Sequence, residues 1–256
     1  ARTNEPHARN LPPTEGGWLP SLANGLGLPP ARHCHRIELH ADGNAALQAL
    51  LALFDSANSR IDIEIFILRD DTVGRQVASA LQRATVRGVS VRVLLDGVGT
   101  LAGHRASAAL LRDAGAELRW FAPLRLRLHP QFGRGNLRNH RKLVLVDGLA
   151  MWTGGRNLAD EYFLDSATPT AWRDLSVVVE GGIVADAAAV FERDWASTST
   201  TTNATSSTAF ALSGHGALAQ LLPSGPDRRD DTAYALFLNG IHRADARVLL
   251  ATPYFV

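Results

Sequence analysis

The chain has 256 residues, of which 46% are apolar and 20% are charged, and its formal net charge is +1. This composition is typical of a folded globular protein and excludes collagen-like and strongly charged disordered chains. A single cysteine, Cys34, excludes an intramolecular disulfide and a cysteine-rich metal site, and no apolar run is long enough to span a bilayer.

Residues 1–35 predict an irregular N-terminal arm, because they are rich in Pro, Gly and Asn. Four apolar residues are scattered through this arm: Trp18, Leu19, Leu22 and Leu26. The arm could rest on a membrane surface or pack across its own domain. Packing is favoured, because single apolar residues are common on protein surfaces.

From residue 36 onward, short apolar runs alternate with helical patterns. Strands are predicted at residues 36–39, 60–68, 89–95 and 116–121, with helices at 44–57, 72–87 and 104–114. Gly88 and Gly115 follow the second and third of these helices, where a left-handed residue commonly ends a helix. The alternation predicts an α/β fold with a mostly parallel mixed sheet covered by helices on both faces.

A hairpin is predicted at the centre of the chain. Residues 142–146 are predicted to form a buried strand, and Asp147-Gly148 is a dipeptide that two-residue hairpin turns favour. With these two residues in the turn, Val146 faces Leu149, and Lys142 faces Thr153.

The same hairpin predicts a pocket for an anion. Because side chains alternate along a strand, His140 and Lys142 share one face. Gly154 and Gly155 return to the same neighbourhood and leave room above the backbone. An imidazole and an ammonium group therefore project side by side, which supplies a potential nucleophile and a cation.

The rest of the chain predicts an incomplete second lobe. A strand at 174–180 and a helix at 183–195 complete a first lobe at 36–196, and a Ser/Thr-rich flexible connection follows at 197–213. Residues 214–256 then begin a weak internal repeat. Its elements are Ala57, Arg60 and Ile61, which correspond to Ala244, Arg247 and Val248.

The motif formed by the hairpin resembles the signature of the phospholipase D superfamily. Six residues of the required types occur at the signature's spacing: His140, Lys142, Asp147, Gly154, Gly155 and Asn157. The alternative is a hairpin whose surface His and Lys merely flank a core strand. Residues 88–96, 136–142 and 251–255 are similar to the cardiolipin synthase-like branch of the superfamily. That resemblance implies two similar lobes, each of which contributes one motif to a shared site.

The resemblance also implies a reaction. The branch transfers a phosphatidyl group from an anionic phospholipid to an alcohol through a phosphohistidine, which here falls on His140. Lys142 and Asn157 would hold phosphate oxygens, and Asp174 would hold the second ring nitrogen of His140, although it could instead be a turn residue or an arginine partner. Asp147 is expected to fix the turn without touching substrate. No metal or cofactor is predicted, because no acidic cluster has metal-ligand spacing.

A basic run precedes the hairpin and bears on the substrate. Residues 118–146 contain no acidic side chain, and Arg138 within this run is expected to bind an anionic headgroup. The same run would suit a nuclease. Glu64 could line the site, but a satisfied strand carboxylate is the simpler interpretation.

The second motif of the branch is missing from this sequence. We therefore expect the other half-site to come from a missing C-terminal lobe, a second chain or a homodimer. A chain without that half could also be inactive and only bind lipid or phosphate. The expected partners are an anionic phospholipid, an alcohol or water acceptor and a membrane surface, with a peripheral location at the bacterial inner membrane or its cytoplasmic side.

Overall fold

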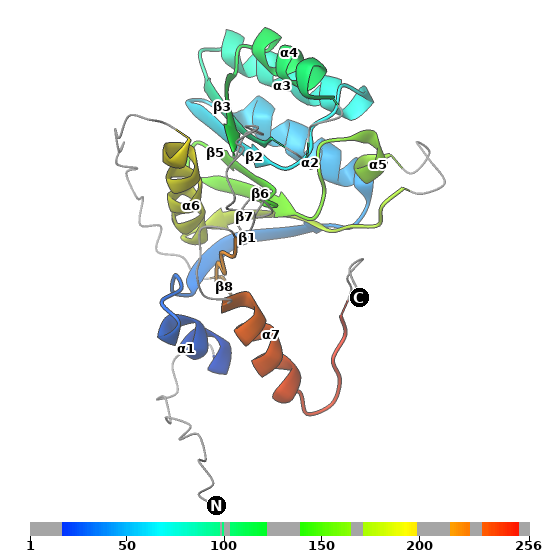
Figure 1. The fold of residues 1–256 in the computed structure, drawn as a ribbon. Helices are drawn as coiled ribbons and strands as arrows, with labels where there is room; N and C mark the ends of the chain where they lie inside the picture. Colours follow the sequence, from blue (N-terminus) through cyan, green and yellow to red (C-terminus); the bar gives the residue numbers. More distant parts are fainter. Residues whose placement is uncertain are drawn as a thin grey trace, which may run out of the picture. The chain divides into compact units, whose positions relative to one another are not determined.

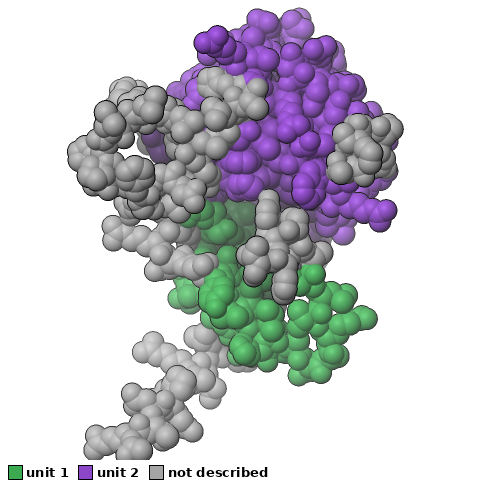
Figure 2. Space-filling view, turned by 45° about the vertical axis from the view of Figure 1, so that its right-hand side comes forward, with its two compact units in different colours: residues 1–31, 220–256 green, residues 32–219 purple. Residues whose placement is uncertain are grey.

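The computed structural model describes residues 17–97, 99, 103–121, 139–164, 171–198, 216–225 and 232–250. The chain divides into two compact units, one of residues 32–219 and one of residues 1–31 with 220–256 (Figure 2). Arg138 and the basic run before it from residue 122, most of the expected Ser/Thr-rich connection, and residues 251–256 lie outside the described residues.

The larger unit contains a mixed sheet with eight described strands in the order β4-β3-β2-β5-β6-β7-β1-β8 (Figure 1). The strands are β1 (Arg32–His40), β2 (Arg60–Ile65), β3 (Ser90–Asp96), β4 (Glu117–Phe121), β5 (Leu143–Val146), β6 (Ala150–Gly154), β7 (Ser176–Gly181) and β8 (Ala217–Ala219). The α/β class and the mixed sheet are confirmed. The sheet is not mostly parallel, however, because within the described residues only β2–β3 and β3–β4 pair in parallel. Helical crossovers precede β3 and β4, whereas the hairpin and the strands after it pair antiparallel.

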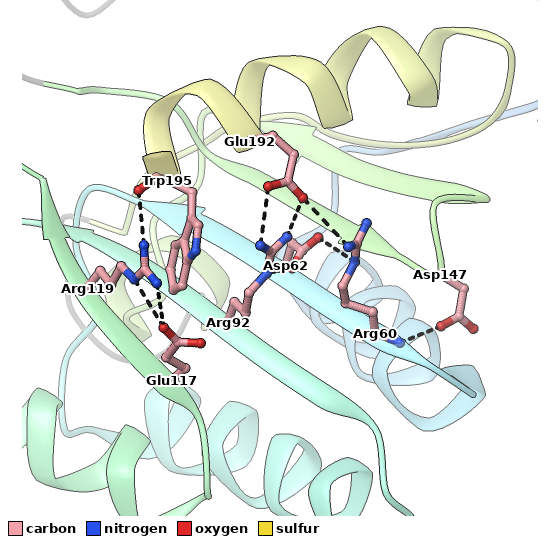
Figure 3. A network of polar contacts seen from close by, with 8 residues as sticks. All are labelled: Arg60, Asp62, Arg92, Glu117, Arg119, Asp147, Glu192 and Trp195. Carbon is pink, nitrogen blue, oxygen red and sulfur yellow. Dashed lines mark hydrogen bonds and ion pairs between the residues drawn. The ribbon is translucent and has the colours of Figure 1, made fainter. Parts of the chain in front are cut away.

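Helices cover both faces of this sheet (Figure 1). They are α2 (Gly43–Ser56), α3 (Thr72–Val86), α4 (His104–Asp113), α5 (Asp160–Phe163) and α6 (Ile183–Ser197). The main apolar core joins α2 and α3 to one sheet face, with Phe54, Val144 and Trp152 fully buried in it. Helix α6 lies on the opposite face, as Figure 3 shows.

Strand β2 divides its side chains between these two faces. Ile61, Ile63 and Ile65 are buried in the apolar core. Asp62 and Glu64 alternate with them and therefore point to the α6 side, where both are 2% exposed. One sheet face is thus an ordinary core, whereas the other is lined with buried charge.

A chain of ion pairs joins α6 to this polar face (Figure 3). Asp62 accepts a hydrogen bond from Nε of Arg92 at 2.7 Å, and Arg92 donates to Glu192 of α6, also at 2.7 Å. The Arg92 guanidinium also lies over the rings of Phe191 and Trp195, 5.0 and 5.1 Å from their centroids. These contacts hold the C-terminal half of α6 against β2 and β3.

The hairpin has one more residue in its loop than predicted. Asp147 and Gly148 occupy the turn with φ angles of 54° and 69°, and the N–H of Leu149 donates to the Val146 carbonyl at 3.0 Å. Strand pairing resumes only at Ala150, which faces Val146, so Leu149 is an extra residue. The predicted pairing of Val146 with Leu149 is therefore wrong.

This extra residue moves the register of the whole hairpin by one position. Leu143 faces Thr153, the partner that was predicted for Lys142. Because side chains alternate, the shift changes which residues of the two strands share a face. Thr153 instead contacts Lys142 through the backbone, since its Oγ1 donates to the Lys142 carbonyl at 2.7 Å.

The smaller unit contains a helix where an irregular arm was predicted. Helix α1 runs over Trp18–Gly25, and β1 of the larger unit begins at Arg32, within the expected arm. Pro20 is the third residue of α1, where the missing N–H breaks no helical hydrogen bond. Ala23 and Leu28 pack with Leu236 of α7 (Thr232–His242), so the arm has an apolar partner.

The described part of the predicted repeat does not contain a strand that corresponds to β2. Residues 244–250 form no strand, and Val248, Leu249 and Leu250 are exposed. Strand β8 joins the sheet of the larger unit beside β1, although residues 214–219 were assigned to the second lobe. The second lobe itself stays a prediction.

Candidate functional site

His140 and Lys142 lie side by side just before β5. The Lys142 side chain is buried, and its Nζ donates a 2.8 Å hydrogen bond to the His140 carbonyl. The same Nζ lies 3.3 Å from Nδ1 of His140, while His140 as a whole is exposed. The structure therefore brings the imidazole and the ammonium group together at an accessible position.

An aromatic ring forms one wall of this pair. Phe66, in the loop after β2, lies against His140 with 4.1 Å between the ring centroids and 40° between the planes. Lys142 Nζ lies 5.3 Å from the same Phe66 centroid, within cation–π range. Nothing in the sequence distinguished Phe66 from an ordinary residue at a strand end, so it was missed.

The surroundings shift the pKa values of both groups downward. Burial lowers the pKa of Lys142 to about 8, although the nearby charge of Asp174 opposes this shift. Burial and the Lys142 charge lower the pKa of His140, against a weaker opposing effect of Asp96. At neutral pH, the site therefore combines a neutral imidazole, which can act as a nucleophile, with a charged ammonium group, which can bind an anion.

Asp174 approaches the site from the chain before β7. Its Oδ1 accepts the N–H of Leu175 at 2.6 Å, and its charge acts on Lys142. Within the described residues, no hydrogen bond links Asp174 to His140. The proposed role of Asp174 as the orienting partner of that ring stays a prediction.

Gly154 and Gly155 allow other parts of the protein to pack closely against their backbone. A Cβ on Gly155 would lie 2.4 Å from both carboxylate oxygens of Asp174. A Cβ on Gly154 would lie 2.2 Å from the Leu175 carbonyl oxygen, and the φ of Gly154 is 150°. The space above them, which was expected to admit substrate, is thus occupied by Asp174 and by the backbone before β7.

Asn157 is buried next to the Phe66 loop. The N–H of Ile67 donates to Oδ1 of Asn157 at 3.1 Å, and Ile67 accepts from the N–H of Leu158 at 3.0 Å. The first of these bonds occupies Oδ1 of Asn157, so the NH2 group is the end of the amide that can donate to another group. A role in holding a phosphate oxygen stays a prediction.

Asp147 lies at the turn, at the far end of β5 from His140. Its carboxylate accepts the backbone N–H groups of Asn58, Ser59 and Arg60 at 2.8–2.9 Å and the Ser59 hydroxyl at 2.7 Å. These hydrogen bonds lower the pKa of Asp147 against the effect of partial burial. This contact set is the one that a structural role requires.

A buried polar cluster lies beneath His140, and the sequence reasoning singled out only one of its members, Glu64. Nδ2 of Asn139 donates to Glu64 and to Asp194 of α6, and NH1 of Arg141 bonds to Asp194. The N–H of Asn139 donates to Asp96 at 3.2 Å. The neighbours of His140 on both sides are therefore held by buried carboxyl groups.

In the described part of the chain, no three His, Cys, Asp or Glu residues gather in a way that could hold a metal ion. The expectation that the site uses no metal or cofactor stays a prediction. Among the helices described, none combines the length and the hydropathy that crossing a membrane would require.

The fold and the site define an α/β domain that presents an imidazole–ammonium pair at the start of a hairpin. Residues 50–195 match the family model described as "Cardiolipin synthase, PLD-like domain", and the chain belongs to this family. The chain is similar to "Cardiolipin synthase A" of Pseudomonas entomophila (34% identity, 100% of this chain, 51% of the relative) and of Pseudomonas syringae pv. syringae, with the same identity and coverage. Among solved structures, NucT from Helicobacter pylori is similar in fold (TM-score 0.51, 14% identity, 62% of this chain and 95% of NucT).

The predicted relationship is therefore confirmed at the level of the family. The chain spans about half the length of the curated relatives that it matches.

Proposed function

We propose that this chain carries one half of the active site of a phosphatidyltransferase or phospholipase that acts on anionic glycerophospholipids. The observation that carries the proposal is the exposed His140 beside the buried ammonium group of Lys142, with Nζ 3.3 Å from Nδ1. The names of the relatives, cardiolipin synthase A, support the lipid class. An enzyme of this kind works at a membrane surface.

His140 is the nucleophile in this proposal. A nitrogen of the neutral ring attacks the phosphorus of the donor lipid, a P–N bond forms, and the P–O bond to the headgroup alcohol breaks. The leaving oxygen takes a proton from a group of the other half-site. In the second step, the oxygen of an alcohol or of water attacks phosphorus, its proton returns to that group, and the P–N bond breaks.

Lys142 and Asn157 stabilise the charge that develops on the phosphoryl oxygens. The ammonium group of Lys142 acts as a point charge, and burial strengthens its effect because the local dielectric constant is low. The NH2 group of Asn157 donates a neutral hydrogen bond. Asp174 keeps Lys142 charged, because its carboxylate raises the pKa that burial lowers.

The second half-site comes from outside the residues of this chain's motif: a further lobe, a second chain or a second copy. We propose a direct test with radiolabelled phosphatidylglycerol vesicles. Turnover is measured with the purified chain alone and with the chain mixed with the separately expressed C-terminal half of the Pseudomonas entomophila relative. The protein is also denatured during turnover, so that a radiolabelled, acid-labile phosphatidyl group on His140 can be detected.

We expect the wild-type protein to form a new lipid product and to carry a radiolabel that is absent from His140→Asn. Unchanged turnover in His140→Asn would contradict the proposal. Cleavage of single-stranded DNA, without any reaction of the vesicles, would contradict the substrate class.

A further inference from the structure

Two carboxyl groups converge beneath the backbone of His140. Glu64 and Asp194 are each 2% exposed. Nδ2 of Asn139 donates to Oε1 of Glu64 and, at 3.3 Å, to Oδ2 of Asp194. NH1 of Arg141 bonds to the same Asp194 oxygen and lies 3.8 Å from the same Glu64 oxygen. One oxygen of each carboxyl group therefore lies against the same amide and the same guanidinium nitrogen.

The remaining surroundings of Glu64 disfavour a second negative charge. Its neighbours across the sheet are Leu94 of β3 and Leu143 of β5. Its Oε2 is buried and has no hydrogen-bond partner among the described residues. Burial and Asp194 raise the pKa of Glu64 to about 9, although Arg141 and Asn139 oppose this. Two ionised carboxylates that contact the same amide nitrogen would repel each other in a region of low dielectric constant.

The pair also holds the chain on both sides of His140. Asn139 binds both carboxyl groups through Nδ2, and its backbone N–H donates to Asp96. Oδ1 of Asn139 accepts the N–H of Arg141 at 3.0 Å. Asn139 and Arg141 thus form a short bridge over the backbone of His140, and the carboxyl pair anchors both ends of that bridge.

We propose that Glu64 and Asp194 share one proton as a carboxylic acid–carboxylate pair, and that this pair is the positioning element for His140. The shared proton lets two acidic groups bind one amide and one guanidinium group without mutual repulsion. Losing it would push the carboxyl groups apart and release Asn139. The positioning role rests on the proposed function, whereas the sharing of a proton does not.

The first test measures the proton itself. Infrared spectroscopy of the wild-type protein at neutral pH should show a protonated carboxyl band that is missing in Glu64→Gln. The amide introduced by this substitution copies the acid, since its carbonyl can accept from Asn139 and its NH2 group can donate to Asp194. A wild-type spectrum without that band, or a band that persists in Glu64→Gln, would overturn the proposal.

The second test measures stability against pH. Because the pKa of Glu64 is raised on folding, the folded state binds the extra proton, and Glu64 loses stabilising effect as pH rises from its ordinary value toward about 9. The Tm of Glu64→Gln should therefore rise relative to wild type between pH of about 6 and about 9. Glu38→Gln is the control, since Arg36 lowers the pKa of partly exposed Glu38 and the carboxylate stays ionised throughout. The proposal would be overturned if the difference in Tm between Glu64→Gln and the wild type were as independent of pH as that of Glu38→Gln.

The third test addresses positioning. In the complemented enzyme, Glu64→Gln should keep kcat within about twofold, whereas Glu64→Ala should lower it by about tenfold or more with little change in KM. The ring signals of His140 in NMR spectra, recorded without substrate, should shift in Glu64→Ala and be restored in Glu64→Gln. Unshifted signals in Glu64→Ala would overturn the positioning role even if no turnover is found, whereas the absence of turnover in the wild type would count only against the proposed function.

Discussion

Replacing Asp147 tests whether the third member of the motif acts through the fold. Asp147→Ala removes four hydrogen bonds, three of them to backbone N–H groups of residues 58–60. A hydrogen bond to a charged group contributes about 1.5–3 kcal/mol when buried, and we take about 0.5–1 kcal/mol for each here because the turn is partly exposed. Alanine at a φ of 54° adds about 1 kcal/mol. The expected loss of unfolding free energy is about 3–5 kcal/mol.

Urea denaturation at neutral pH measures this loss, and two further variants divide it into its causes. Asp147→Gly removes the hydrogen bonds without backbone strain, and Asp147→Asn keeps a residue that tolerates positive φ but removes the charge. Asp55→Ala breaks an exposed pair with Arg83, and as a control it should cost less than about 1 kcal/mol. Because the pKa of Asp147 is lowered on folding, its contribution is present above the ordinary Asp pKa and is lost on acidification through the lowered value. Loss of turnover in Asp147→Ala without loss of stability would refute a structural role.

Three further outcomes are expected. Turnover should fall from a pH of about 8 upward, because Lys142 loses its charge there. The acid limit of turnover should lie below the ordinary histidine range, because the pKa of His140 is lowered. A pH–rate profile measures both limits, and an alkaline limit above 10 would contradict the role given to Lys142. Lys142→Met should abolish turnover, yet urea denaturation at pH 7 should show an unfolding free energy that is higher by about 1–2 kcal/mol. The reason is that a buried lysine with a lowered pKa destabilises the fold as long as its side chain is charged. Gly155→Ala should displace Asp174 and move the alkaline limit of turnover to lower pH. Gly154→Ala should chiefly unfold the protein, because its Cβ would meet the Leu175 backbone. An unchanged alkaline limit in folded Gly155→Ala would contradict the effect of Asp174 on Lys142.

Local pattern was sufficient to predict several features of the fold. Gly88 and Gly115 follow α3 and α4 with φ angles of 89° and 81°, and Asp147-Gly148 occupies a turn with both φ angles positive. The family could be predicted because its motif lies within one hairpin, so that the residue spacing reports the structure directly. The proportion of parallel strands could not be predicted, because it depends on where the chain re-enters the sheet after β4.

The details that differ depend on single residues or on distant contacts. Leu149 belongs to the turn and not to the strand pairing, and this one-residue difference gives Thr153 to Leu143 and not to Lys142. The atoms that occupy the space above Gly154 and Gly155 belong to the chain before β7, and no pattern within the hairpin indicates them. Phe66 contacts His140 and Asp194 contacts Asn139 from other parts of the chain, and no local spacing indicates either contact.

The polar face of β2 connects the fold to the chemistry. Replacing a buried ion pair with apolar side chains is often neutral or stabilising, so contact between α6 and the sheet does not itself require Asp62, Arg92 and Glu192. These residues fix the C-terminal half of α6, and that half carries Asp194 to the underside of His140. An apolar replacement of Asp62 and Arg92 together could therefore preserve stability while loosening the placement of Asp194. The buried charge on this face is thus better explained by the position that it gives to Asn139 and His140 than by the stability of the sheet.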